Sequence, residues 1–319
     1  MAYLKKSPHG IMFHHFHGEN HPKTQGSISE GDFKKILNYI GRERILPPLK
    51  WLERLSGNKL EAEDLCLTFD DGLSSQVDVA LPVLEYYGLK AFWFVYSSVF
   101  EGKLENLEIY RFFRTRYFDK SDIFYQVFFQ KISESGLTEK ASPAAEEKTI
   151  GELQKLFPFY SRNDARFRFF RDKILGKENY EKIMDSILEE YGLAKNDLAK
   201  NLWMSNQDLK RLNSGGHLVG LHSYSHPTAL AELSYQEQIR EYQKNYSHLR
   251  KVCGKNPISM SHPCNSYNKE TLKILRELGV SCGFLSNMFS KIATENQLAI
   301  NNLEIPREDH VNIVATLRL

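Results

Sequence analysis

Acidic and imidazole side chains stand at the ends of short apolar runs in this chain of 319 residues. Asp70 and Asp71 follow the run DLCLTF and precede Gly72, and His222 and His226 stand at and after the end of the run HLVGLH. Two adjacent carboxylates ionise together at low cost only where a cation neutralises one of them. Two imidazoles and one carboxylate make a metal site with open positions for water. The spacing therefore predicts a site for metal and proton chemistry.

Other runs end in the same residue types. The first and fifth runs end in histidines, and the last ends in a cluster of basic and acidic residues. These residues, at or just after the ends of the runs, are His14, His15, His17, His262, Arg307, Glu308, Asp309 and His310. Open α/β sheets and α/β barrels build their sites at the carboxyl ends of the strands. We therefore expect these side chains to gather at one end of the predicted sheet.

The elements that must position these groups alternate along the chain. Short apolar runs are typical of buried parallel strands, and they lie at 10–16, 64–69, 90–96, 217–222, 257–262, 281–286 and 303–307. Helical patterns with capping residues at their ends separate most of them, at 28–40, 74–87, 234–252 and 268–278. Strand alternating with helix predicts an α/β fold with a parallel sheet, and the number of strands suits closure into a barrel.

The interval 98–201 breaks this alternation and is predicted to be a mainly helical insertion after the third strand. It holds two segments that mix arginine with aromatic residues, at 110–118 and 166–174. One interpretation is a helical subdomain with an aromatic core and solvated arginines. In the others, the arginines clamp a phosphate or carboxylate while the aromatics stack on a sugar or base, or the face lies against a membrane surface.

Three motifs carry a resemblance to a known family. Thr68-Phe69-Asp70-Asp71-Gly72 and His222-Ser223-Tyr224-Ser225-His226 are intact, and 261–268, SHPCNSYN, is a loose third motif that lacks the arginine of the commoner Arg-x-Pro-Tyr version. Together they resemble the NodB-homology polysaccharide deacetylases of the carbohydrate esterase family 4 type. The resemblance covers 11–96 and 203–307 and leaves the insertion unmatched.

The resemblance implies a distorted (β/α)7 barrel, with 1–319 forming a single catalytic domain. It implies that Asp71, His222 and His226 hold a divalent metal, most commonly Zn²⁺, and that Asp70 is the general base. It also implies that the backbone N–H of Tyr267 holds the oxyanion. Around the substrate and oxyanion we further place Pro263, Arg307 and His14.

The residue that protonates the leaving amine is left open by the sequence. Relatives use a histidine in a Leu-x-His motif near the C-terminus, and no such motif follows the third motif here. The candidates are His310, His262 and His15, with His14 or a water as alternatives. For each histidine, a structural or substrate-contacting role is the competing interpretation.

The composition of the chain limits the classes of partner that it can bind. A formal net charge of +2 gives no basic surface for nucleic acid. No run is long enough to span a membrane, the first residues do not resemble a signal peptide, and the scattered cysteines read as free thiols, so we expect a cytoplasmic protein with peripheral membrane contact possible. The sequence predicts a metal-dependent hydrolase that removes an N-acyl, most simply N-acetyl, group from an amino sugar in a glycan, a lipid-linked precursor or a sugar nucleotide. The alternatives are a catalytically silent sugar-binding homologue and a deformylase or amidase acting on another C–N bond.

Overall fold

The computed structural model describes residues 3, 7–137, 142–156, 160–288 and 302–319. The chain divides into two compact units, described separately below. The barrel unit comprises 1–105 and 201–319, and the helical unit comprises 106–200. The insertion predicted at 98–201 thus begins later in the structure, since 98–105 belongs to the barrel unit. That the whole chain acts as one catalytic domain stays a prediction.

The barrel unit is built on a parallel sheet. Its strands are β1 (His9–Phe13), β2 (Leu65–Phe69), β3 (Phe92–Val95), β4 (Leu218–Leu221), β5 (Ser259–Ser261), β6 (Cys282–Phe284) and β7 (Arg307–Asp309). They pair in the order β6-β5-β4-β3-β2-β1-β7. A parallel bridge from Phe284 to Ile305, just before β7, brings the two edges together and nearly closes the barrel. The predicted fold class, a distorted (β/α)7 barrel, is confirmed; the last strand alone is displaced, from 303–307 to 307–309.

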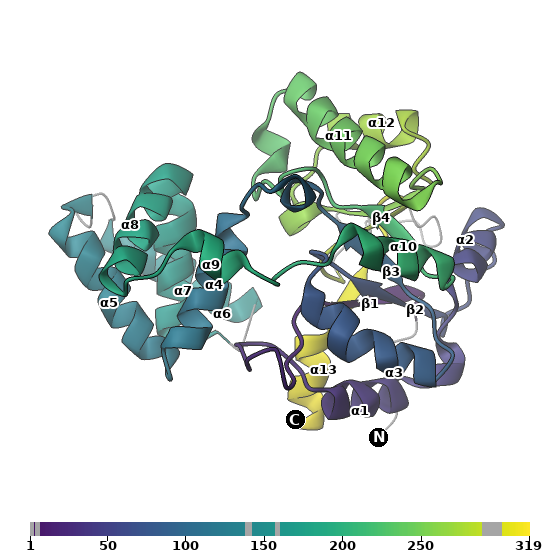
Figure 1. The fold of residues 1–319 in the computed structure, drawn as a ribbon, viewed down its shortest axis with the longest axis horizontal. Helices are drawn as coiled ribbons and strands as arrows, with labels where there is room; N and C mark the ends of the chain where they lie inside the picture. Colours follow the sequence, from purple (N-terminus) through teal and green to yellow (C-terminus); the bar gives the residue numbers. More distant parts are fainter. Residues whose placement is uncertain (1–2, 4–6, 138–141, 157–159, 289–301) are drawn as a thin grey trace. The chain divides into compact units, whose positions relative to one another are not determined.

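Helices surround these strands (Figure 1). They are α1 (Glu30–Ile40), α2 (Pro48–Ser56), α3 (Leu81–Tyr86), α10 (Asn206–Ser214), α11 (Tyr235–Cys253), α12 (Lys269–Glu277) and α13 (His310–Leu317). Side chains at Ser29, Ser205, Ser234 and Asn268 form complete capping boxes, which fix the starts of α1, α10, α11 and α12. Helices α2 and α13 were not predicted, and α13 begins at His310, where the sequence suggested a strand-end loop.

Alternation along β2 decides which of its side chains reach the site. Leu65, Leu67 and Phe69 belong to the large core shared with the surrounding helices. Cys66 packs in a separate core with Trp51 of α2 and with side chains of β3 and β6. Because successive strand residues point to opposite faces, Asp70 continues the face of Cys66 and Thr68. The first acid of the pair therefore enters the barrel at its carboxyl end.

The helical unit contains α4 (Asn106–Tyr117), α5 (Ser121–Glu134), α6 (Pro143–Leu156), α7 (Arg162–Phe169), α8 (Gly176–Glu190) and α9 (Lys195–Ala199). A π-helical segment, Phe170–Leu175, joins α7 to α8. The aromatics form its core, as the subdomain interpretation predicts, but Arg114 is not solvated: it is 7% exposed and its guanidinium lies over the rings of Phe124 and Phe167. Within the described residues, no helix of either unit combines the length and hydropathy of a membrane span.

Candidate active site

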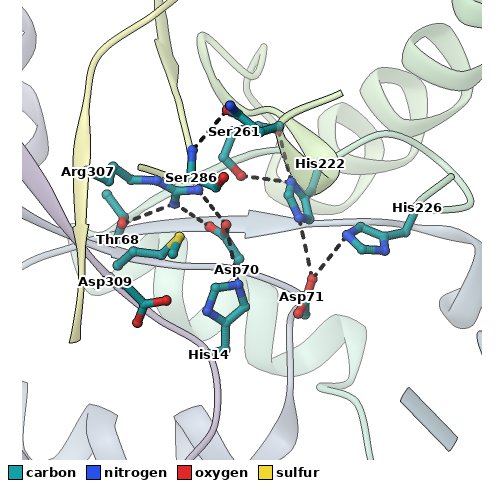
Figure 2. Close-up of polar contacts among 12 residues, drawn as sticks. His14, Thr68, Asp70, Asp71, His222, His226, Ser261, Ser286, Arg307 and Asp309 are labelled. Carbon is teal, nitrogen blue, oxygen red and sulfur yellow. Dashed lines mark hydrogen bonds and ion pairs between the residues drawn. The ribbon is translucent and has the colours of Figure 1, made fainter. Parts of the chain in front are cut away.

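The second acid of the pair and the two motif histidines form one cluster. Nε2 of His222 lies 3.4 Å and Nε2 of His226 lies 3.6 Å from Oδ1 of Asp71. One ligand atom from each of the three residues falls within 4.8 Å of the other two (Figure 2). Oδ1 of Asp71 is buried and makes no hydrogen bond within the described part of the chain. A buried acceptor facing two imidazoles without hydrogen bonds fits a bound cation, and two nitrogens with one oxygen suit zinc.

The turn after β2 aims Asp71 at the histidines. Asp71 and Gly72 both have left-handed backbone, with φ of 76° and 64°. At Gly72 a Cβ atom would lie 2.9 Å from Cγ1 of Val95, so glycine is required both for conformation and for space. The consecutive acids consequently point in different directions, Asp70 into the barrel and Asp71 toward β4.

A second partner sets the tautomer of His222. Its Nδ1 lies 3.0 Å from the backbone oxygen of Ser261 and 2.7 Å from its hydroxyl oxygen. A proton on Nδ1 donates to Ser261 and leaves the Nε2 lone pair directed at the cluster. Burial lowers the pKa of His226 to about 4, which keeps this imidazole neutral and able to bind a metal.

Asp70 is held by an arginine from β7, two strands along the sheet from β2. Nη1 and Nη2 of Arg307 each donate to one carboxylate oxygen of Asp70 at 2.7 Å, and Nη1 also reaches Oγ1 of Thr68 at 3.2 Å. Asp70 is 2% exposed and Arg307 is fully buried. Gly10 on β1 makes room for the arginine, since a Cβ there would lie 3.0 Å from Cγ of Arg307.

The electrostatics keep both acids ionised. Burial alone would raise the pKa of Asp70, but the positive charge of Arg307 outweighs it and the pKa falls below its ordinary value. Burial likewise opposes ionisation of Asp71, yet the adjacent imidazoles of His222 and His226 hold its pKa well below the usual range. The two neighbouring carboxylates are therefore stabilised separately, Asp70 by a guanidinium and Asp71 by two imidazoles.

His14 is the strand-end histidine that lies nearest Asp70 among those described. Its Nε2 is 3.8 Å from Oδ2 of Asp70 and its side chain is 26% exposed. Asp309 is a second acid in this part of the site (Figure 2), and contact with His310, with a smaller contribution from His14, lowers its pKa to about 2. Fully buried Gln76 joins this pair, because its Nε2 donates to the backbone oxygens of His14 at 2.7 Å and of Asp70 at 2.6 Å.

The structure does not bring His310 to the cluster. The ring stacks on Phe13, and its two nitrogens lie 3.1 Å from the carbonyl oxygen of Met12 and 3.0 Å from that of Gly26. Since α13 begins at this residue, the side chain turns back against β1 and is 2% exposed. A donor held by two backbone carbonyls has no route to a leaving amine.

His262 lies in the barrel wall. Its Nε2 donates to the carbonyl oxygen of Leu303 at 2.8 Å, and burial lowers its pKa to about 4. A neutral imidazole that already donates its proton is poorly placed to protonate an amine. His15 is partly exposed, with its ring stacked beside that of His14 at a centroid distance of 5.9 Å.

The third motif forms a short turn after β5. Pro263 is buried in the 3-10 turn Pro263–Asn265, and Tyr267 stacks on His262 at 4.2 Å while its hydroxyl donates to Glu304 at 2.6 Å. The phenol is thus occupied by structural contacts. The role predicted for Tyr267 uses only its backbone N–H, and that role and a substrate contact by Pro263 stay predictions.

Sequence analysis missed the residues that hold the site from behind. Ser261 orients His222, Gln76 spans His14 and Asp70, and Glu241 and Asn245 of α11 bind the loop between the two histidines. The sequence offers one indication of the role of Gln76, an uncharged amide at the start of a helical segment six positions after Asp70. It offers none for Glu241 and Asn245, because their spacing is that of any two residues on one face of a helix.

Comparisons with known proteins agree with the motifs. The sequence model described as polysaccharide deacetylase matches residues 155–283. No curated protein matches the chain. Three solved structures share its fold: the deacetylase PplD of Streptococcus pyogenes in complex with acetate (18% identity, TM-score 0.54, covering 95% of this chain and 92% of that one), IcaB from Ammonifex degensii (15%, 0.54, 95% and 91%) and a de-N-acetylase from Aggregatibacter actinomycetemcomitans (11%, 0.52, 94% and 93%).

At such identities the likeness to these structures concerns the fold alone. The family match adds a likeness in sequence, and the matched segment includes the whole of the second and third motifs. The first motif lies outside the matched segment; it begins at the end of β2, the strand that pairs with β3, and supplies Asp71 to the same cluster. The resemblance read from the motifs is confirmed: residues 155–283 match the polysaccharide deacetylase family, and the barrel has the fold of the deacetylase structures.

Proposed function

We propose that the chain is a metal-dependent hydrolase that removes an N-acyl group, in the simplest case acetyl, from an amino sugar. The observation that carries the proposal is the division of the acid pair. Oδ1 of Asp71 faces His222 and His226 and has no hydrogen-bond partner among the described residues, whereas Asp70 is ionised, buried and clamped by Arg307. One acid is arranged as a ligand and the other as a base.

Asp71, His222 and His226 would hold the cation, which we propose to be Zn²⁺. A divalent cation at this position supplies positive charge that polarises an amide carbonyl and acidifies water. Nδ1 of His222 stays protonated on Ser261, so that its Nε2 remains a neutral ligand. The low pKa of His226 gives the same result for the second imidazole.

Asp70 is the proposed general base. It takes the proton of the attacking water, and the bidentate contact with Arg307 fixes both oxygens of the carboxylate so that the base cannot turn away. Arg307, predicted from the sequence at the substrate, is fully buried and is therefore proposed to act through Asp70. Tyr267 remains the proposed backbone donor to the oxyanion.

His14 is the proposed general acid for the leaving amine. It is partly exposed, and its Nε2 lies 3.8 Å from Oδ2 of Asp70, so its ring borders the proposed base and can be reached by substrate. His15 stays the alternative. Cytoplasmic location and peripheral membrane contact likewise stay predictions.

The experiment is acyl release from a panel of N-acetylated amino sugars, free, oligomeric and nucleotide-linked, with the released acid identified by mass. Asp70→Asn is expected to lower the rate by a factor of about 10²–10⁴, the usual contribution of a positioned base. Asp197→Asn, at a carboxylate 65% exposed in the helical unit, is the matched control and is expected to leave the rate unchanged.

The same assay decides among the alternatives. Equal rates for Asp70→Asn and wild type would contradict the assignment of Asp70 as the general base. Sugar binding without any released acid indicates a silent homologue, and release of formate indicates a deformylase.

A further inference from the structure

The loop that carries both histidines of the cluster has a strained backbone. Ser223 and His226 have φ of 62° and 54°, in the left-handed region that residues other than glycine avoid. Such conformations are strained and persist only where the surroundings hold them. His226 is itself one of the strained residues. Contacts that hold this loop therefore decide where its ring lies.

One carboxylate binds the middle of the loop. Oε2 of Glu241 accepts the backbone N–H of Tyr224 at 3.0 Å and of Ser225 at 2.8 Å, while Oε1 accepts the hydroxyl of Ser225 at 2.8 Å. From the other side, the carbonyl oxygen of Tyr224 accepts the N–H groups of Ser97 and Ser98. The peptide before Ser225 is thus held at both its polar ends.

The same helix binds the start of the loop. Asn245 lies one turn after Glu241 on α11 and is fully buried. Its Oδ1 accepts the N–H of His222 at 3.0 Å, and its Nδ2 donates to the carbonyl oxygen of Val95 at 2.9 Å. Asn245 thus ties His222 to β3, while Glu241 acts on the segment that ends at His226. The two halves of the loop have separate supports.

We propose that Glu241 is a positioning residue for the metal ligand His226, an inference that rests on the metal centre of the proposed function. Its contacts with the loop are to backbone N–H groups and a serine hydroxyl, so it acts through the shape of the loop. The ammonium groups of Lys103 and Lys244 lie over the ring of Tyr224, at 5.0 Å and 4.8 Å from its centre, so positive charge is present beside this loop independently of Glu241. Hydrogen-bond acceptance, rather than charge, is the function of Glu241.

The test is metal affinity, measured by competition with a chromophoric chelator for Zn²⁺ and by the visible spectrum of the Co²⁺ form. Glu241→Ala is expected to weaken Zn²⁺ binding by about 10–100-fold, as loss of an outer-shell partner usually does, and to alter the Co²⁺ spectrum. Glu241→Gln keeps an acceptor for the two N–H groups and a donor to the Ser225 hydroxyl, and is expected to bind close to wild type. Gln243→Ala, on an exposed position of the same helix, is the control and is expected to be unchanged.

Each outcome of these measurements either supports or overturns the role of Glu241. Wild-type affinity in Glu241→Ala overturns the inference, and so does a glutamine variant as weak as alanine, because charge would then be what matters. An alanine variant that unfolds without metal, judged by circular dichroism, assigns Glu241 to the fold and also overturns it. If the wild-type protein itself binds neither Zn²⁺ nor Co²⁺, there is no metal centre. The proposed function is then overturned, for a reason that does not involve Glu241.

Discussion

Replacing Arg307 with methionine tests the buried ion pair on which the proposed base depends. The methionine keeps much of the apolar stem but removes the guanidinium that donates to both oxygens of Asp70. The side chains of Arg307 and Asp70 are 0% and 3% exposed, so water does not replace the lost partner. Asp70 would remain in the barrel as a buried charge without its counter-ion.

The size of the effect follows from this burial. Breaking a buried pair by removing one partner costs about 3–5 kcal/mol. The Coulomb energy agrees, since charges roughly 4 Å apart at an effective dielectric constant near 20 attract by about 4 kcal/mol. Domains have about 5–15 kcal/mol of stability in total, so we expect Arg307→Met to fold but to unfold at much lower urea concentration.

Tryptophan fluorescence is the assay of choice because Trp51, Trp93 and Trp203 all lie in the barrel unit. Urea unfolding followed at these residues therefore reports the free energy of unfolding of the unit that contains the pair. Arg211→Met is the matched control, since Arg211 is 53% exposed and pairs with Glu85 at the surface. An exposed pair of this kind contributes about 0–1 kcal/mol.

A double-mutant cycle isolates the pair itself. Arg307→Met combined with Asp70→Asn should be less destabilised than the sum of the single variants, by up to about 3 kcal/mol. A loss in Arg307→Met as small as that of the surface control would refute the reasoning, because Asp70 would then be protonated or hydrated without the arginine. The activity of Arg307→Met is expected to fall together with stability.

Three further outcomes are expected. Removing metal with a chelator should lower the urea midpoint of the barrel unit, and added Zn²⁺ should restore it. At a free Zn²⁺ concentration of 100 times Kd, binding is expected to add about 2.7 kcal/mol to the free energy of unfolding. A midpoint that does not depend on metal would contradict the cluster. Gly10→Ala, whose Cβ would lie 3.0 Å from Cγ of Arg307, should cost about 1–3 kcal/mol of unfolding free energy, whereas Gly151→Ala, with open space around its Cβ, should cost none. Burial opposes the charged form of His310, yet contact with Asp309 raises its pKa above the ordinary 6.5, so its charge stabilises the fold below that pH and the effect is lost as pH rises through the raised value. The difference in unfolding free energy between wild type and His310→Gln should therefore shrink at alkaline pH, and a pH-independent difference would contradict this.

The cluster of Asp71, His222 and His226 could be predicted because each residue is close in sequence to the end of a strand. Parallel strands bring their carboxyl ends together, so local position in the sequence becomes proximity in space. Strand positions were recognisable from the same apolar runs, to within a few residues for β1 through β6. The three residues of the cluster are therefore recognisable from local sequence.

The partner of Asp70 could not be found in this way. Arg307 is 237 residues away in sequence and reaches Asp70 only because β7 pairs with β1 and β1 with β2. Its register places Arg307 opposite Gly10, and Gly10 opposite Cys66, on the face that leads to Asp70. A displacement of β7 by one residue would turn the arginine out of the barrel. Burial of the guanidinium is a property of that register and has no local signal.

The same register bears on the irregular third motif. The arginine that the commoner version of this motif carries is missing from 261–268, which from the sequence alone argues for a silent homologue. In the structure a guanidinium nevertheless holds Asp70, and it comes from β7 instead. His14, at the end of β1 between β7 and β2, lies 3.8 Å from the same carboxylate. Arg307, His14 and Asp70 thus lie on, or directly after, the three adjacent strands β7, β1 and β2. We propose that this part of the barrel supplies a guanidinium in place of the absent arginine and an imidazole in place of the absent Leu-x-His histidine.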